Sequence, residues 1–448
     1  MKLKPPTPLR GRKARSLVAA TVAIVGFSGL AIAQTTTVAH ADPTEVLVAV
    51  GSDTVQDVYN QFALDLTGNA LGSYDAVNPV TQTQGDNISY ADGSGHTNCS
   101  FTRPNGSGGG LSALRESINP GTSIGPLTGA ALDQPGCVDI ARSSSSVTDD
   151  GHQSNTGPIV FVPFGVDAVA GATGGSAAGA AYSYMGQTIT PQATFITHAG
   201  DFSLVDLVNL YKNCIPVTED GVTYDPNNTS SGAGGGTVAN PTPIHLYIPQ
   251  ASSGTAKFWI KVLSNGGSAL GGCVHNTIDP ATSLPAVNAG AANLIVEEHN
   301  GTAVVADPNG FGPFSIAQWI AQSNATSNGG TLNTNDRRHG AIVQTLKGCT
   351  SVTFGSPATG TCSPTPTATG ANTATHGGTL NTAFPITREV YSVVSFARVS
   401  SATDPLFSFL NANSVQDTLC NDVGTITGFG FAVAPDCGNV TTANRSAD

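Results

Sequence analysis

Positive charge is scarce in this chain once its first forty residues are set aside. The sequence has 18 Lys and Arg against 30 Asp and Glu, and six of the cations but none of the acids lie before residue 16. Without that segment, 12 cations face 30 acids and the net charge falls from −12 to about −18. Such a surface repels nucleic acid and anionic lipid, so we expect neither as a partner. Local dipoles and hydrogen bonds must hold any bound anion, because the long-range field opposes it.

Signatures of metal and cofactor chemistry are also missing. There is no Cys-x-x-Cys, and the nine histidines are scattered singly. We therefore expect no metal site, no cofactor and no enzymatic activity. Two other classes stay open: a secreted hydrolase such as a phosphatase, whose nucleophile a serine-rich turn would supply, and an adhesive or coat protein of the cell surface.

The chain lacks a cysteine before Cys99, and its N-terminus has the features of an export signal. A basic start precedes an apolar run at residues 16–33, which is too short and too rich in Gly and Ala to favour a membrane span. We expect cleavage of residues 1–41 after Ala41, with Ala33 as the alternative. The new N-terminus would then have no thiol for a lipid anchor. We expect a monomer that is secreted, free or associated with the cell wall, and not inserted in a membrane.

Eight cysteines in an exported chain favour disulfide bonds. Their spacing supports local pairs, although the sequence leaves the connectivity open. The local pairs are Cys99 with Cys137, Cys214 with Cys273, Cys349 with Cys362, and Cys420 with Cys437.

Four short apolar runs each end in a turn rich in Gly, Ser or Thr, and three of these turns lead into a helical pattern. This pattern of strands followed by helices predicts an α/β protein with mostly parallel sheets. In such proteins a ligand binds beyond the carboxyl ends of the strands. The turns that lead into helices are residues 51–54, 105–110 and 252–255, and the fourth is 142–146.

About 400 residues remain after cleavage. This is more than usually fold around a single hydrophobic core, so we expect two lobes. The candidate crossing strands are residues 160–164 and 390–394. On this division, lobe 1 comprises residues 44–162 plus 392–448. Lobe 2 comprises residues 163–391, with insertions rich in Gly, Ser and Thr at 230–238 and 363–378.

The three turns before helices are suited to anions. A helix N-terminus leaves backbone N–H groups unpaired and has a partial positive charge, so it stabilises an anion without a lysine. Ser and Thr add hydroxyl donors, and Gly lets a ligand approach the backbone. One such turn is usually a plain helix cap. Three of them, each after an apolar strand, favour a small-oxyanion site.

The order of these turns resembles that of the phosphate-binding proteins of ABC transporters, and the chain is similar to actinobacterial-type members of that family. The resemblance runs from about residue 45 to 435 and includes the segments 252–259 and 384–391. It implies a two-lobed periplasmic-binding-protein-like fold of type II, joined by hinge strands. It also implies inorganic phosphate as the ligand and an ABC permease as the partner.

The resemblance also implies site residues. Two positions depart from the family pattern, because Ser144 stands where an acceptor aspartate is expected and Pro249 where an arginine is expected. Asp53 is our candidate for the acceptor and Arg142 for the counter-charge, with an N-cap and an ordinary ion pair as the open alternatives. The predicted ligand-binding residues are Ser52, Asp53, Thr54, Gly106, Ser107, Gly108, Arg142, Ser143, Ser144, Ser252, Ser253, Gly254 and Thr255.

Three further features are assigned structural roles. His245 lies within an apolar strand pattern, where we expect a satisfied wall residue. Lys257 is expected to face solvent. Residues 297–299, Glu-Glu-His, follow an apolar helical pattern and precede Asn-Gly, so we expect a solvated helix end there.

Overall fold

The computed structural model describes residues 47–66, 70–80, 85–90, 99–119, 136–264, 267, 269–286, 293–348, 361–364, 378–414 and 418–447. The chain divides into two units, residues 1–35 and 36–448, and every described residue belongs to the second. The predicted export signal and its cleavage site lie outside the described residues. Within the described part of the chain, no helix has both the length and the apolar character needed to cross a bilayer.

Parallel strands form the first set of the central sheet. β1 (Leu47–Gly51) pairs in parallel with β2 (Leu71–Ser73) on one side and with β5 (Ile140–Ser143) on the other. Every residue of β1 is buried, as its apolar run predicts. The helices η1 (Asp53–Val55) and α1 (Gln56–Asp65) follow β1.

A hairpin leads into the second helix of this set. β3 (Asn87–Tyr90) pairs with β4 (Cys99–Thr102), and α2 (Gly106–Ile118) begins soon after β4 ends. α2 begins at Gly106, whose φ of +74° is a conformation that side chains other than Gly rarely adopt.

A second set of parallel strands lies farther along the chain. β12 (His245–Tyr247) pairs in parallel with β13 (Val274–His275) and with β17 (Gly310–Ser315). Helix α5 (Gly254–Leu263) follows β12, and its N-cap Ser253 accepts hydrogen bonds from the N–H groups of Thr255 and Ala256. Helices α6 (Thr302–Ala306) and α7 (Ile316–Ser323) precede and follow β17.

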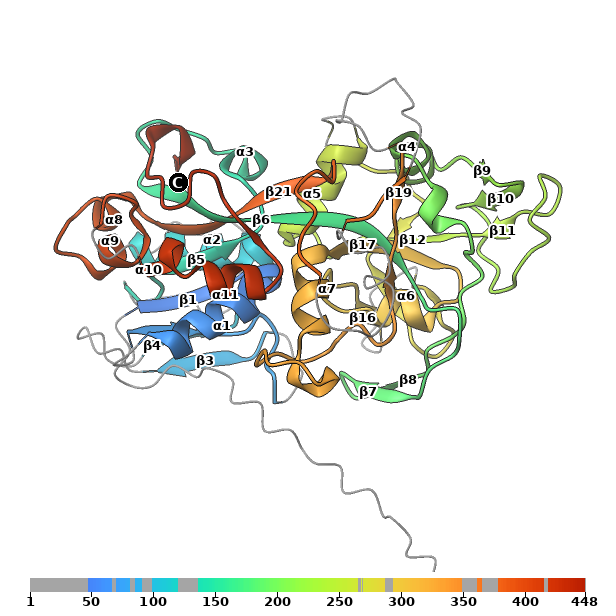
Figure 1. Ribbon diagram of the computed structural model, residues 1–448, viewed down its shortest axis with the longest axis horizontal. Helices are drawn as coiled ribbons and strands as arrows, with labels where there is room; N and C mark the ends of the chain where they lie inside the picture. Colours follow the sequence, from blue (N-terminus) through green and yellow to red (C-terminus); the bar gives the residue numbers. More distant parts are fainter. Residues whose placement is uncertain are drawn as a thin grey trace, which may run out of the picture. The chain divides into compact units, whose positions relative to one another are not determined.

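Two long antiparallel strands join the sets, as Figure 1 shows. β6 (Ile159–Thr173) and β21 (Thr387–Ser395) pair along their length, from Thr387 opposite Ala168 to Ser395 opposite Ile159. β21 also pairs with β5, and β6 with β17, so one sheet of 11 strands contains both sets. The predicted α/β class is confirmed, and both predicted crossing strands lie within these two elements.

Each end of β6 belongs to a different hydrophobic core. Val160 and Phe164 pack in a cluster with Phe62 of α1. Ala168 and Ala170 pack in a cluster with Trp259 of α5. The division into two lobes remains a prediction, because Ala317 and Ala321 of α7, assigned to lobe 2, pack in the same cluster as Val160.

Three of the four predicted disulfides are confirmed, between Cys99 and Cys137, Cys214 and Cys273, and Cys420 and Cys437. The pair of Cys349 with Cys362 lies outside the described residues, because Cys349 is not among them.

The other elements are short. They are α3 (Val147–Asp150), β7 (Tyr182–Tyr184), β8 (Gln187–Ile189), η2 (Ala199–Asp201), α4 (Leu204–Tyr211), β9 (Val217–Glu219), β10 (Val222–Asp225), β11 (Thr242–Pro243), β14 (Thr277–Asp279), β15 (Leu284–Pro285), β16 (Leu294–Ile295), η3 (Thr326–Asn328), β18 (Ile342–Val343), β19 (Leu346–Lys347), β20 (Thr361–Cys362), α8 (Phe396–Val399), α9 (Pro405–Leu410), α10 (Thr418–Asn421), α11 (Val423–Gly428), β22 (Ala432–Val433), η4 (Thr442–Asn444) and β23 (Arg445–Ser446).

Candidate functional site

Three of the predicted turns meet through their serine hydroxyls. Ser52 Oγ, after β1, donates to Ser144 Oγ, after β5, at 3.1 Å. Ser107, in the first turn of α2, lies with its Oγ 3.3 Å from Ser144 Oγ and accepts a hydrogen bond from the Ser144 backbone N–H at 2.9 Å. All three residues are buried. We call Ser52, Ser107 and Ser144 the serine cluster.

The turn before α5, from the second strand set, closes against this cluster. The backbone N–H of Gly108 donates to the carbonyl oxygen of Ser252 at 3.0 Å. A Cβ on Gly254 would lie 2.5 Å from Ser107 Oγ and closer still to Ser144 Oγ. A Cβ on Gly106 would lie 2.7 Å from Ser252 O. Glycine at these two positions therefore permits contact between the two strand sets.

A buried carboxylate accepts hydrogen bonds from three more hydroxyls. Thr54 Oγ1 and Thr255 Oγ1 each donate to Glu298 Oε1 at 2.9 Å. Ser253 Oγ lies 3.0 Å from both Glu298 oxygens. We call Thr54, Ser253 and Thr255 the hydroxyl cradle. It joins the turn after β1 to the N-terminus of α5.

The prediction of a solvated helix end at residues 297–299 is wrong. Glu297, Glu298 and His299 have exposed fractions of 3 %, 0 % and 4 %. The segment connects β16 to α6, and the N–H of Ser315, at the end of β17, donates to Glu298 O at 3.0 Å. This bond holds the Glu298 backbone beside β17, so the side chain is directed toward the cradle instead of solvent.

Arg388 of β21 is the cation at the cradle. Its Nη2 donates to Thr255 Oγ1 at 2.6 Å, and its Nη1 donates to the carbonyl oxygen of Ser144 at 3.1 Å. The same guanidinium forms an ion pair with Asp167 of β6 at 3.0 Å, and both groups are buried. Sequence reasoning missed Arg388 as a site residue, although an arginine next to a predicted crossing strand was a usable signal.

A third group lies beside the cradle and contains Asp53. Asp53 Oδ2 is 2.8 Å from His299 Nδ1, and Glu297 Oε2 is 3.7 Å from the same nitrogen. Asn105 Nδ2 donates to Glu297 Oε1 at 3.3 Å. The N-cap alternative for Asp53 is wrong, because Asp53 is the first residue of η1 and α1 begins at Gln56.

Burial and neighbouring charges separate the pKa values of the three acids. Burial raises the pKa of Glu298 to about 7, and the charge of Asp53 adds to the effect. Burial and the Asp53 charge also hold the pKa of Glu297 well above its usual range. Burial opposes ionisation of Asp53 too, but the neighbouring charge of His299 outweighs it and lowers the pKa of Asp53. Asp53 is therefore the acid held in its charged form.

Two predicted ligand residues bond elsewhere. Arg142 is fully buried, and its guanidinium donates to Ser73 Oγ at 2.7 Å and to the carbonyl oxygen of Tyr74. Burial lowers the pKa of Arg142 to about 10, against the opposing charge of Asp75. Ser143 Oγ donates to the carbonyl oxygen of Ser145 at 2.8 Å. The cation at the cradle is thus Arg388 and not Arg142, because Arg142 is directed toward the segment that follows β2.

The prediction that His245 is a satisfied wall residue holds for only one of its two ring nitrogens, because Nε2 is buried without a hydrogen-bond partner. His245 is buried in β12, and its Nδ1 lies 2.7 Å from Asp307 Oδ2. Lys257 is partly exposed in the first turn of α5.

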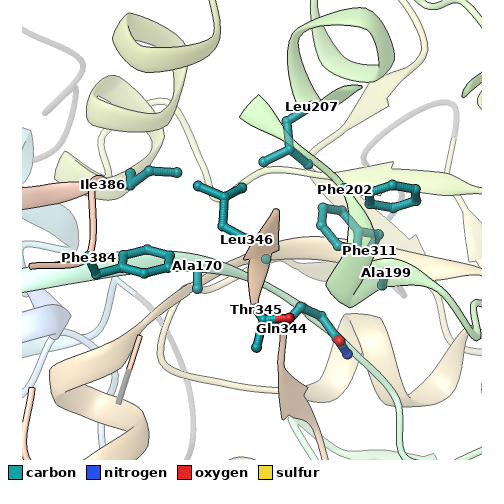
Figure 2. A pocket seen from close by; sticks show the side chains of 11 residues that line it. Ala170, Ala199, Phe202, Leu207, Phe311, Gln344, Thr345, Leu346, Phe384 and Ile386 are labelled. Carbon is teal, nitrogen blue, oxygen red and sulfur yellow. The ribbon is translucent and has the colours of Figure 1, made fainter. Parts of the chain in front are cut away.

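A separate, mostly apolar pocket contains none of these groups. In Figure 2, Phe384 and Ile386 lie on one side of Leu346 and Phe202 and Phe311 on the other. The residues that line it are mostly apolar, and Gln344 and Thr345 supply its polar side chains.

Comparison with known proteins gives only distant likenesses. No protein-family model matches the chain, and no curated protein matches it. A solved structure of a possible phosphate-binding protein from Planctomyces limnophilus is 12% identical with a TM-score of 0.32, over 88% of this chain and 93% of that one. A putative phosphate ABC transporter substrate-binding protein with bound phosphate from Clostridium perfringens is 9% identical with a TM-score of 0.38, over 87% and 99%. A phosphate-binding protein from Stenotrophomonas maltophilia is 14% identical with a TM-score of 0.34, over 88% and 91%. These TM-scores are too low to carry an argument about the ligand.

Proposed function

We propose that this chain is an exported binding protein that captures a small oxyanion in the hydroxyl cradle, with inorganic phosphate as the first candidate. The observation that carries the proposal is that the hydroxyls of the cradle already bind a carboxylate, that of Glu298. Three hydroxyls donate to the Glu298 carboxylate within 3.0 Å. The same donors suit a phosphate oxygen, because hydroxyls bind both kinds of oxyanion in the same way.

In this proposal, Arg388 supplies the positive charge beside the bound anion. Its ion pair with Asp167 leaves the two groups together with no net charge. Directed donors, and not long-range attraction, then hold the anion, which agrees with the acidic composition of the chain. The serine cluster supplies further hydroxyls at the edge of the cradle.

Glu298 is our candidate for the acceptor of a ligand proton, in place of Asp53. A ligand that enters the cradle must take over hydroxyl donors that now serve Glu298. A monoprotonated phosphate can then donate its own O–H to the Glu298 carboxylate. Sulfate has no proton to donate at neutral pH, so the carboxylate repels it.

We further propose that the two predicted lobes close over the ligand by bending at β6 and β21. The hydrogen bond from Gly108 N to Ser252 O joins the two strand sets in the closed arrangement. The ABC permease, the extracellular location and the monomeric state are part of the same proposal.

Calorimetric titration of the ligand-stripped protein with phosphate tests the proposed function. We expect binding at micromolar level or tighter, roughly −8 kcal/mol. Flat traces with phosphate and with sulfate would instead favour a cell-surface role. Steady hydrolysis of a phosphomonoester that disappears in Ser253→Ala would favour a hydrolase.

Replacing Glu298 by glutamine tests its part as the acceptor. Glutamine keeps the shape of the side chain but brings an N–H₂ donor and loses one acceptor oxygen. We expect phosphate to bind about 100-fold more weakly, while sulfate binds as well as phosphate or better. Competition titrations with the two anions measure the ratio. A variant that still prefers phosphate to the wild-type extent would contradict this role.

A further inference from the structure

We infer that Asp53, Glu297 and His299 form a site for a divalent transition-metal ion of the zinc or manganese class, next to the hydroxyl cradle. Each residue offers one ligand atom, and the three atoms lie within 4.8 Å of one another. All three side chains are buried. Nothing in the sequence pattern pointed to this site, because Asp53 is about 245 residues from the other two ligands in the chain.

Two of the ligand atoms are buried polar atoms without a hydrogen-bond partner. Asp53 Oδ2 and His299 Nδ1 lie 2.8 Å apart, at ion-pair distance, yet neither forms a hydrogen bond. Asp53 is 1 % exposed and His299 is 4 % exposed, so water does not readily serve either group. Buried polar atoms are almost always satisfied, and a shared cation would satisfy both.

The donor set selects the class of metal. One imidazole nitrogen and two carboxylate oxygens suit Zn²⁺ or Mn²⁺, whereas Cu(I) prefers sulfur and Ca²⁺ prefers six or more oxygens. The bond from Asn105 Nδ2 to Glu297 Oε1 is the kind of outer contact that orients a metal ligand. Three protein ligands leave at least one coordination position for water or another oxygen donor.

The balance of buried charge also favours a cation here. Asp53, Glu297 and Glu298 place three carboxyl groups in one buried region. Arg388, the guanidinium at the cradle, is already paired with Asp167. A divalent ion between Asp53 and Glu297 would bind both carboxyl groups in their charged form and compensate that charge. Because Asp53 follows β1 and the other two ligands precede α6, the ion would also link the two strand sets.

Zinc uptake by the purified secreted protein tests this inference, and phosphate is left out so that the result does not depend on the proposed function. The protein is stripped with a chelator, dialysed and titrated with Zn²⁺ alone, and bound metal is measured by mass spectrometry. We expect about one zinc per chain and a rise of several degrees in Tm. Co²⁺ in the same site should give the visible absorption of a metal bound to nitrogen and oxygen.

The matched variants are His299→Gln and His198→Gln. His198 belongs to a second group of possible ligands, with Asp201 and Asp220, that is partly exposed. We expect His299→Gln to lose the bound zinc and the zinc-dependent rise in Tm, while His198→Gln keeps both. Asp53→Asn, which preserves the side-chain shape, should behave like His299→Gln. It replaces His299→Gln as the test variant if that protein does not fold.

Two outcomes would overturn the inference. Wild-type protein that takes up no zinc at micromolar concentrations would show that His299 is only an ion-pair partner of Asp53. Equal zinc uptake by wild type, His299→Gln and Asp53→Asn would place the metal elsewhere on the chain.

Discussion

Replacing Arg388 by methionine is expected to abolish anion binding and to lower the free energy of unfolding by about 3–5 kcal/mol. Asp167 is fully buried, and the substitution would leave its carboxylate without the guanidinium that now pairs with it. Thr255 and the carbonyl oxygen of Ser144 would lose their donor at the same time. Urea denaturation measures the first effect and calorimetry with phosphate the second.

A double variant separates folding from binding. Arg388→Met with Asp167→Asn removes both charges, and the amide introduced by the second substitution would keep an oxygen to accept the hydrogen bond from Ala317 N. We expect the double variant to recover a large part of the stability while phosphate binding stays absent. If Arg388→Met alone bound phosphate as tightly as the wild type, Arg388 would not be at the ligand.

A methyl group at position 106 is expected to weaken phosphate binding by at least about 100-fold. Gly106 has a φ of +74°, which costs a side-chain residue about 1–3 kcal/mol. The added Cβ would also lie 2.7 Å from the carbonyl oxygen of Ser252, which is backbone and cannot move aside as a side chain does. Gly106→Ala should therefore push the turn before α5 away from α2.

Gly109→Ala is the matched control for this change, in the same helix. The nearest atoms to a Cβ at position 109 belong to Pro104 at 3.5 Å, which is ordinary van der Waals contact. We expect phosphate affinity to change less than about threefold in Gly109→Ala, because an alanine in a helix interior is favourable. Equal losses in both variants would show that α2 itself, and not the approach of the two turns, is sensitive to added side chains.

The parts of the site that follow local rules were predictable from the sequence. Apolar runs predicted β1 and β12, and turns rich in Gly and Ser predicted the starts of α2, which follows β4, and of α5, which follows β12. Thr54 and Thr255 follow β1 and β12 of different strand sets, and Ser107 follows β4 of an antiparallel pair, so their proximity was expected from the family resemblance and not from strand direction. Spacing along the chain favoured the three described disulfides, although it left the connectivity open.

The missed residues depend on long-range contacts that no local pattern records. Glu298 resembles a solvated acid because its neighbours Glu297 and His299 are polar, yet hydrogen bonding to β17 holds the segment inside the protein. The buried charge of Arg388 is compensated by Asp167, which lies opposite it on the neighbouring strand β6. Arg142 looked like the cation of the site because it adjoins the serines, but its guanidinium donates to Ser73 and to the carbonyl oxygen of Tyr74, about 70 residues earlier in the chain.

If the cradle binds an anion as proposed, the Glu298 carboxylate competes with that anion for the hydroxyl donors before it accepts the ligand proton. A tethered rival is always present at a fixed effective concentration, whereas the concentration of a free anion varies with the surroundings. The apparent affinity is then the intrinsic affinity of the cradle reduced by the fraction of molecules in which Glu298 has withdrawn. The apparent affinity at low anion concentration would thus depend on how readily Glu298 releases the hydroxyls, in addition to how well these donors fit the ligand.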